Sequence, residues 1–184
     1  QMLKSKILHI FDFDGVVVDS VNIKNDEFYT LYEYLPIHMK HKVFNFLEQN
    51  IGLTRKYKIE YIEKNILENK NYIEESLEKI SKFSVNIIEK VSNSDLMPGA
   101  IEYLEFLNKN NNNIIVIVSA TPDLELVKII KNKDLSKYFD SVYGSFQNKI
   151  ETIISLKARF NLESDQLVFY GDAINDLNAS KELK

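Results

Sequence analysis

The feature that most constrains the fold is a short apolar run that ends in two aspartates. Residues 7–11 have the pattern of a buried parallel strand, and Asp12 and Asp14 follow directly in the stretch "HIFDFDGVVVDS". Both carboxylates point to the same side if the chain stays extended, because side chains alternate along a strand. At about 4 Å and an effective dielectric of about 20, two such charges repel by about 4 kcal/mol. The chain therefore needs a cation, a shared proton or a turn at this point.

The composition narrows the class of protein. With 45% hydrophobic and 27% charged residues, the 184-residue chain is typical of a soluble globular protein. A net charge of -4 argues against a nucleic-acid partner, because there is no basic excess to neutralise phosphates. No cysteine is present, and neither a membrane span nor a signal peptide is recognisable, so we expect a cytoplasmic protein without a membrane partner. The composition does not indicate an oligomeric state.

The distribution of apolar residues divides the chain into zones. Residues 20–95 hold few glycines or prolines and have helical periodicity. In residues 96–184 apolar runs at 114–118, 141–144 and 167–171 alternate with helical segments, which predicts a parallel sheet covered by helices. We therefore expect an α/β core formed by residues 1–19 and 96–184, with residues 20–95 as an all-helical insert. A helix is predicted from Pro122, with Thr121 as its N-cap.

Polar residues follow each predicted strand, at the sheet edge where ligands of such folds bind. They combine an acid pair, a hydroxyl, a cation and a second acid pair. Converging carboxylates suit a hard cation such as Mg²⁺, and a lysine with a hydroxyl suits a phosphate. The residues are Asp12, Asp14, Gly15, Ser119, Ala120, Thr121, Lys149, Gly171, Asp172, Asn175 and Asp176.

These residues resemble the four motifs of the haloacid dehalogenase superfamily. "DFDGVVVDS" is similar to its first motif, DxDGxxxDS, and "VSAT" to its second, a strand that ends in Ser or Thr. Lys149 fits the third motif, and "GDAINDLNAS" fits the fourth, GDxxxD. The closest branch contains phosphoglycolate phosphatase-like enzymes and β-phosphoglucomutases. The resemblance implies a Rossmann-like core with a helical cap inserted after the first motif.

The resemblance also implies a reaction and roles for its residues. Asp12 is the nucleophile that forms an aspartyl-phosphate, and Asp14 is the general acid and base. Mg²⁺ is held by Asp12, the backbone carbonyl of Asp14 and Asp172, with help from Asp176. The phosphoryl group is held by Ser119, Lys149 and the backbone N–H groups near Gly15 and Ala120. The expected enzyme is a phosphatase for a small phosphorylated metabolite, such as a sugar phosphate or phosphoglycolate.

Substrate selectivity is expected to reside in the helical insert. The segment "NIGLTRKYKIEYIEKNIL" resembles cap segments of phosphatase-like members of the superfamily. Arg55 in this segment is a candidate to hold the part of the substrate that does not react. The alternative is a surface arginine that begins a helix.

Two departures from the superfamily pattern keep other functions open. Ile150 follows Lys149 where relatives usually have proline, and the sequence ends at Lys184 where relatives usually continue through another strand and helix. We therefore expect that strand and helix to be absent from the core. The alternatives to a phosphatase are a β-phosphoglucomutase-like phosphotransferase and a binding module that keeps the fold without catalysis. Asp14 itself favours phosphoryl transfer over dehalogenation.

Overall fold

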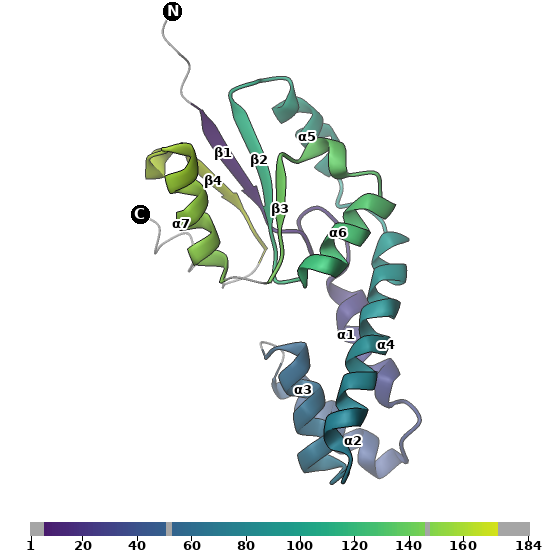
Figure 1. The fold of residues 1–184 in the computed structure, drawn as a ribbon. Coiled ribbons are helices and arrows are strands. Elements are labelled where there is room, and N and C mark those ends of the chain that lie inside the picture. The colour runs from purple at the N-terminus through teal and green to yellow at the C-terminus, as the bar shows by residue number, and fades with distance from the viewer. Residues whose placement is uncertain (1–5, 51–52, 146–147, 173–184) are drawn as a thin grey trace, which may run out of the picture. The chain divides into compact units, whose positions relative to one another are not determined.

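The computed structural model describes residues 6–50, 53–145 and 148–172, and the chain folds as two compact units. The first unit comprises Gln1–Val21 and Val91–Lys184, and the second is Asn22–Lys90. The first unit has an α/β architecture, and the second is helical in its described residues (Figure 1).

The α/β unit is built on four parallel strands in its described part. They are β1 (Ile7–Phe11), β2 (Asn113–Val118), β3 (Ser141–Tyr143) and β4 (Leu167–Tyr170), in the order β3-β2-β1-β4 (Figure 1). At the carboxyl end of the sheet, Phe11 is level with Ile117 on β2 and with Tyr170 on β4. The structure thus confirms the prediction of an α/β fold with a parallel sheet. The predicted lack of a further strand and helix concerns residues after Asp172, which lie outside the described residues.

Helices pack against both faces of this sheet. On one face, Leu8 and Ile10 of β1 form a buried core with Ile153 and Leu156 of α7 (Lys149–Phe160). Phe11 points to the opposite face, because side chains alternate, and its ring contacts Tyr103 of α5 (Ala100–Asn108). Short 3₁₀ turns at Ser136–Tyr138 (η2) and Ser164–Gln166 (η3) precede β3 and β4.

Helix α6 differs from its predicted start. It spans Asp123–Asn132, and Pro122 occupies the N-cap position. The predicted N-cap, Thr121, is therefore wrong by one position, and its hydroxyl donates instead to Asp14 at 2.8 Å. A proline with a φ of -54° fits equally well before the first helical turn, which frees the threonine side chain for another partner.

The helical unit is formed by four α-helices and one π-helical turn in its described part. They are α1 (Val21–Tyr32), α2 (Ile37–Gln49), α3 (Arg55–Tyr61), η1 (Ile62–Ile66) and α4 (Tyr72–Ser92). The fully buried Glu27 carboxylate of α1 accepts hydrogen bonds from Asn86 at 2.7 Å and from Lys90 at 2.6 Å, both on α4. This pairing ties α1 to α4, since a buried carboxylate left without donors is strongly destabilising. None of the described helices is long and apolar enough to cross a membrane.

His9 is a buried titratable group in the centre of the α/β unit. Its side chain is 6% exposed, its Nδ1 lies 2.8 Å from the Tyr170 hydroxyl, and its ring stacks on that tyrosine. Burial lowers the pKa of His9, because the imidazolium form loses its hydration. The folded chain therefore resists protonation of His9.

We expect the α/β unit to lose stability as the pH falls below the ordinary histidine range. The unfolded chain protonates His9 near a pKa of about 6.5, so below that pH it binds more protons than the folded chain. Stability that is complete above this pKa is then lost as the pH decreases. Thermal unfolding at about pH 7.5 and about pH 5.5 should show a larger loss for the wild type than for His9→Asn, whose amide can replace the Nδ1 hydrogen bond. Equal losses in both proteins would contradict this assignment.

Candidate active site

Asp12 lies at the carboxyl end of β1, where three contacts fix it. Its backbone N–H donates to the Tyr170 carbonyl at 2.9 Å, which continues the pairing with β4. Its Oδ1 accepts the Phe13 N–H at 2.7 Å, and its Oδ2 lies 3.1 Å from Nζ of Lys149. The side chain of Asp12 is only 13% exposed, so the lysine compensates a carboxylate charge that is largely removed from water.

Lys149 is brought to the site by the start of α7. The side chain of Asn148 caps this helix by accepting the Ile150 N–H at 2.9 Å. The residue after the lysine therefore has a satisfied N–H, where a proline would have none. Lys157, further along α7, donates to the Ser164 hydroxyl at 2.8 Å. Lys149 therefore lies within hydrogen-bond distance of Asp12 although no proline follows it.

Asp14 is held by two hydroxyl groups from different parts of the chain. Ser20, which is fully buried, donates to Oδ1, and Thr121, which is 2% exposed, donates to Oδ2 at 2.8 Å. Asp14 and Asp12 therefore have separate donors, and neither requires a proton shared with the other. The sequence predicts neither of these contacts. The only signal is that each hydroxyl lies within a recognised motif, "DS" and "VSAT".

The loop after β2 carries Ser119, Ala120 and Thr121. Ser119 is 3% exposed, its hydroxyl lies 3.2 Å from that of Thr121, and its Oγ accepts the Thr121 N–H at 3.1 Å. Ala120 between them is exposed. The loop is anchored to the end of β3, because the Ser119 N–H donates to the Tyr143 carbonyl at 2.9 Å.

Gly15 occupies the turn after the two aspartates. Its φ of +75° is in the left-handed region, and a Cβ at this position would overlap the carboxylate of Asp172. Asp172 therefore lies against the turn that carries Asp12 and Asp14, although it comes from the end of β4. The Gly15 N–H donates to the Val18 carbonyl at 2.8 Å and so closes the turn, while the role of the N–H groups near Gly15 in holding phosphate stays a prediction. Gly15 also provides the space for Asp172.

Three of the predicted ligand groups offer the oxygen atoms that Mg²⁺ prefers. They are the carboxylates of Asp12 and Asp172 and the backbone carbonyl of Asp14, and of these Asp172 lies against the turn at Gly15. Mg²⁺ commonly uses one or two protein carboxylates and retains several waters, so a small donor set of this kind is sufficient. Within the described ranges, no three His, Cys, Asp or Glu side chains form a group able to hold a metal ion. The fourth predicted ligand, Asp176, lies outside the described residues.

Arg55, the predicted selectivity residue, is the first residue of α3 in the helical unit. Its Nη1 donates to the Ser84 hydroxyl at 3.0 Å, and its guanidinium lies 4.2 Å from the ring centroid of Phe83. Thr54 caps the helix by accepting the Tyr57 N–H at 3.3 Å. These contacts place Arg55 at a helix start against α4, and they are compatible with both interpretations of this residue.

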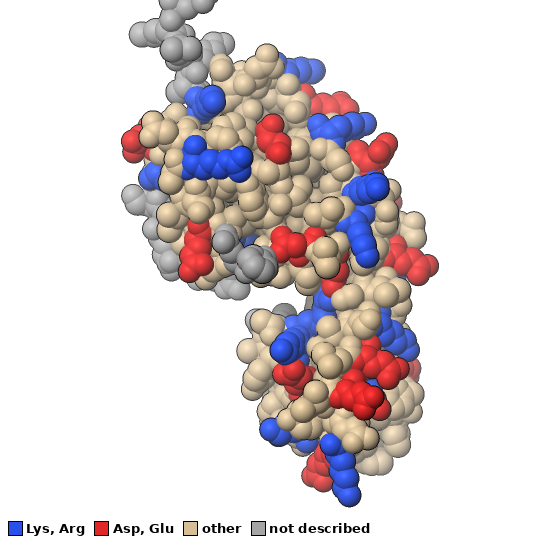
Figure 2. All heavy atoms as spheres, in the orientation of Figure 1, with Lys and Arg blue, Asp and Glu red and all other residues tan. Residues whose placement is uncertain are grey.

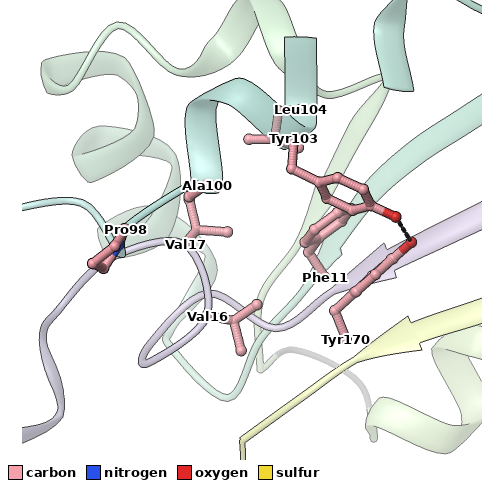
Figure 3. Close-up of a pocket in the computed structure, with 9 residues that line it drawn as sticks. Phe11, Val16, Val17, Pro98, Ala100, Tyr103, Leu104 and Tyr170 are labelled. Atoms are coloured by element: carbon pink, nitrogen blue, oxygen red, sulfur yellow. Dashed lines mark hydrogen bonds between the residues drawn. The ribbon is translucent and has the colours of Figure 1, made fainter. Parts of the chain in front are cut away.

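An apolar cavity of about 200 Å³ lies in the α/β unit (Figure 3). No predicted site residue lines it. In Figure 3, Phe11, Tyr103 and Tyr170 lie together, and the two tyrosine hydroxyls are 2.8 Å apart. The residues that line the cavity are Phe11, Val16, Val17, Pro98, Gly99, Ala100, Tyr103, Leu104 and Tyr170. These side chains offer no charged group to a substrate.

The charges on the surface show no extended region of one sign on the visible face. Figure 2 shows basic and acidic side chains interspersed over the described part of this face, in each unit. A continuous basic stripe, which binding to a nucleic-acid backbone requires, is not seen on it.

Comparisons with known proteins agree with this fold. The sequence profile described as haloacid dehalogenase-like hydrolase matches residues 9–184. A predicted phosphoglycolate phosphatase from Haemophilus somnus has a similar structure, with 19% identity and a TM-score of 0.73 over 100% of this chain and 84% of that one. A predicted β-phosphoglucomutase from Thermotoga maritima has 19% identity and a TM-score of 0.71 over 96% of this chain and 81% of that one. A predicted HAD hydrolase from Bacillus subtilis, solved with bound magnesium, has 16% identity and a TM-score of 0.68 over 98% and 86% of the two chains. No curated protein sequence matches this chain.

We expect Gly144→Ala to destabilise the loop that carries Ser119 and Thr121. A Cβ on Gly144 would lie 2.5 Å from the Thr121 carbonyl oxygen and 2.6 Å from the Asp123 nitrogen, both backbone atoms that cannot rotate away. The expected loss of unfolding free energy is about 3 kcal/mol, as for overpacking of a core.

Gly99→Ala is the matched control for this prediction. Gly99 has a φ of +80° but no neighbouring atom within 4 Å of an added Cβ, so only conformational strain of about 1 kcal/mol is expected. Urea unfolding of both variants compares the two losses. Similar losses would show that the contact between Gly144 and the loop is not close.

Proposed function

The chain belongs to the haloacid dehalogenase-like hydrolases, and from this membership we propose that it is a magnesium-dependent phosphatase acting on a small phosphomonoester. The observation that carries the proposal is the separate placement of Asp12 beside Lys149 and of Asp14 between two hydroxyls. A nucleophile must stay ionised, whereas a general acid and base must be able to exchange a proton. Two carboxylates in different surroundings suit these two tasks.

In the first half of the reaction, Asp12 attacks the phosphorus atom. A bond forms between its carboxylate oxygen and phosphorus, and the bond from phosphorus to the leaving oxygen breaks. Asp14 donates a proton to that leaving oxygen, so that an alcohol departs. The Phe13 N–H holds one oxygen of Asp12, while Lys149 pairs with the other and provides a cation for the phosphoryl oxygens.

In the second half, water hydrolyses the aspartyl-phosphate. Asp14, now ionised, accepts a proton from the attacking water, phosphate departs, and Asp12 regains its carboxylate. The Ser119 hydroxyl, which donates to Thr121 in this structure, would turn to a phosphoryl oxygen, and the N–H of Ala120 on the same loop would hold another. Mg²⁺ bound by Asp12, Asp172 and the Asp14 carbonyl, with Asp176, would neutralise charge on the transferred group.

We also propose roles for the insert and for the location of the protein. Residues 20–95 act as a cap that selects the substrate, with Arg55 contacting the part of the substrate that does not react. A sugar phosphate or phosphoglycolate fits this arrangement, and the chemistry and the lack of cysteine suit the cytoplasm.

A phosphotransferase of the β-phosphoglucomutase type is the second candidate. It is favoured by the structural similarity to the predicted phosphoglucomutase from Thermotoga maritima and uses the same pair of aspartates. A strict requirement for a sugar bisphosphate, without release of free phosphate, would identify this activity.

We expect Mg²⁺-dependent release of phosphate from at least one member of a panel of sugar phosphates and small phosphorylated acids. Asp12→Asn should reduce the release by a factor of about 10³ or more, because the nucleophile is lost. EDTA should abolish it. Asp165→Asn, an exposed aspartate next to β4, is the control and should retain activity.

Phosphate release that persists in Asp12→Asn would contradict the proposed mechanism. If no member of the panel releases phosphate, the same panel is repeated with added sugar bisphosphate to test for phosphoryl transfer between sugars. Failure of both assays would leave the binding module as the function of the fold.

A further inference from the structure

We propose that Thr121 is a positioning residue that aims the Asp14 carboxylate at the leaving group of the substrate. The proposal rests on the proposed phosphatase function. It gives a role in catalysis to a second hydroxyl of the loop after β2, besides that of Ser119. It follows from three features: a fixed backbone at Thr121, a one-way chain of hydrogen bonds, and the geometry of a carboxylate.

The backbone of Thr121 is fixed by the end of β3. Its carbonyl accepts the Ser145 N–H at 3.0 Å, and Gly144 lies so close that it has no room for a side chain. The Gly144 N–H in turn donates to the Asp123 carboxylate at 2.7 Å. The Thr121 hydroxyl therefore projects from a rigid support, which is what positioning of a reacting group requires.

The hydroxyl of Thr121 has only one proton, and the structure directs it to Asp14. Its oxygen lies 2.8 Å from Oδ2 of Asp14 and 3.2 Å from the Ser119 hydroxyl, which donates to it. The chain of donors therefore runs from Ser119 through Thr121 to Asp14. Ser119 and Thr121 are 3% and 2% exposed, so water does not compete for these bonds.

Two donors are needed because a carboxylate rotates easily about its last bond. That torsion is broad for aspartate, and the Ser20 hydroxyl acts on Oδ1. Thr121 holds Oδ2 from another element and thereby defines the plane of the carboxylate. Removing this hydroxyl should impair transfer of a proton more than binding of the phosphoryl group.

The test compares two kinds of leaving group. An alkyl phosphate releases a basic alkoxide and needs a proton from Asp14, whereas p-nitrophenyl phosphate releases a phenolate that is stable without one. For Thr121→Val we expect kcat/KM to fall about 100-fold with the alkyl phosphate on which the wild type is most active. With p-nitrophenyl phosphate we expect a fall of no more than about 3-fold. Since kcat/KM reports the steps through formation of the aspartyl-phosphate, later hydrolysis does not affect the comparison.

Three controls separate positioning from damage to the fold. Thr121→Ser restores the hydroxyl and should recover most of the activity on the alkyl phosphate. Thr152→Val makes the same change at a buried threonine of α7, whose hydroxyl donates to the Asn148 carbonyl at 3.0 Å, and its effect should not depend on the leaving group. Thermal unfolding of all variants verifies that they are folded.

An equal loss of kcat/KM with both substrates in folded Thr121→Val, or no loss with either, would overturn the proposal. A failure of Thr121→Ser to recover activity would do the same. Inactivity of the wild-type protein on all substrates would instead reject the proposed phosphatase function, so the two failures are distinct.

Discussion

The ion pair between Asp12 and Lys149 is the interaction on which the arrangement of the site depends. An apolar strand delivers two carboxylates to one sheet edge, and their mutual repulsion would disfavour the folded chain unless each finds its own partners. One carboxylate has a lysine at 3.1 Å and a backbone N–H, and the other has two neutral hydroxyls. The glycine turn between strand and insert makes this division possible, because it lets the chain leave the extended conformation directly after Asp14.

Much of the α/β unit can be predicted from local pattern. The apolar runs locate the four strands, and their bounds agree with the structure within one residue, since each run is short and is followed by polar residues. The pairing order of the strands, with β4 beside β1, does not follow from these runs, because the order depends on how connections cross the sheet. The placement of Lys149 at the site follows from a motif, despite Ile150 in the place of proline.

The hydroxyl partners of Asp14 cannot be found in the same way. Thr121 and Asp14 are 107 positions apart in sequence, and nothing local distinguishes a threonine that caps a helix from one that donates across the sheet edge. The local rule favours the cap, because threonine before proline is a common helix start. Likewise, nothing in the motif indicates that the Gly15 N–H donates to the Val18 carbonyl within the turn. The same limit applies in the helical unit, where the partners of Glu27 lie 59 and 63 positions away.

The cap of α7 has a consequence for how chains of this family are recognised. A helix start must deal with backbone donors that have no carbonyl to bind, and there are two solutions at the position after the lysine. Proline removes the donor, whereas Asn148 supplies an acceptor for it. Proline and the asparagine cap differ in sequence, but both leave no unsatisfied N–H at the position after the lysine. Either one therefore allows the helix to begin at the same lysine. A motif defined by a lysine–proline pair would miss this chain, whose lysine reaches Asp12 from a helix start that an asparagine caps.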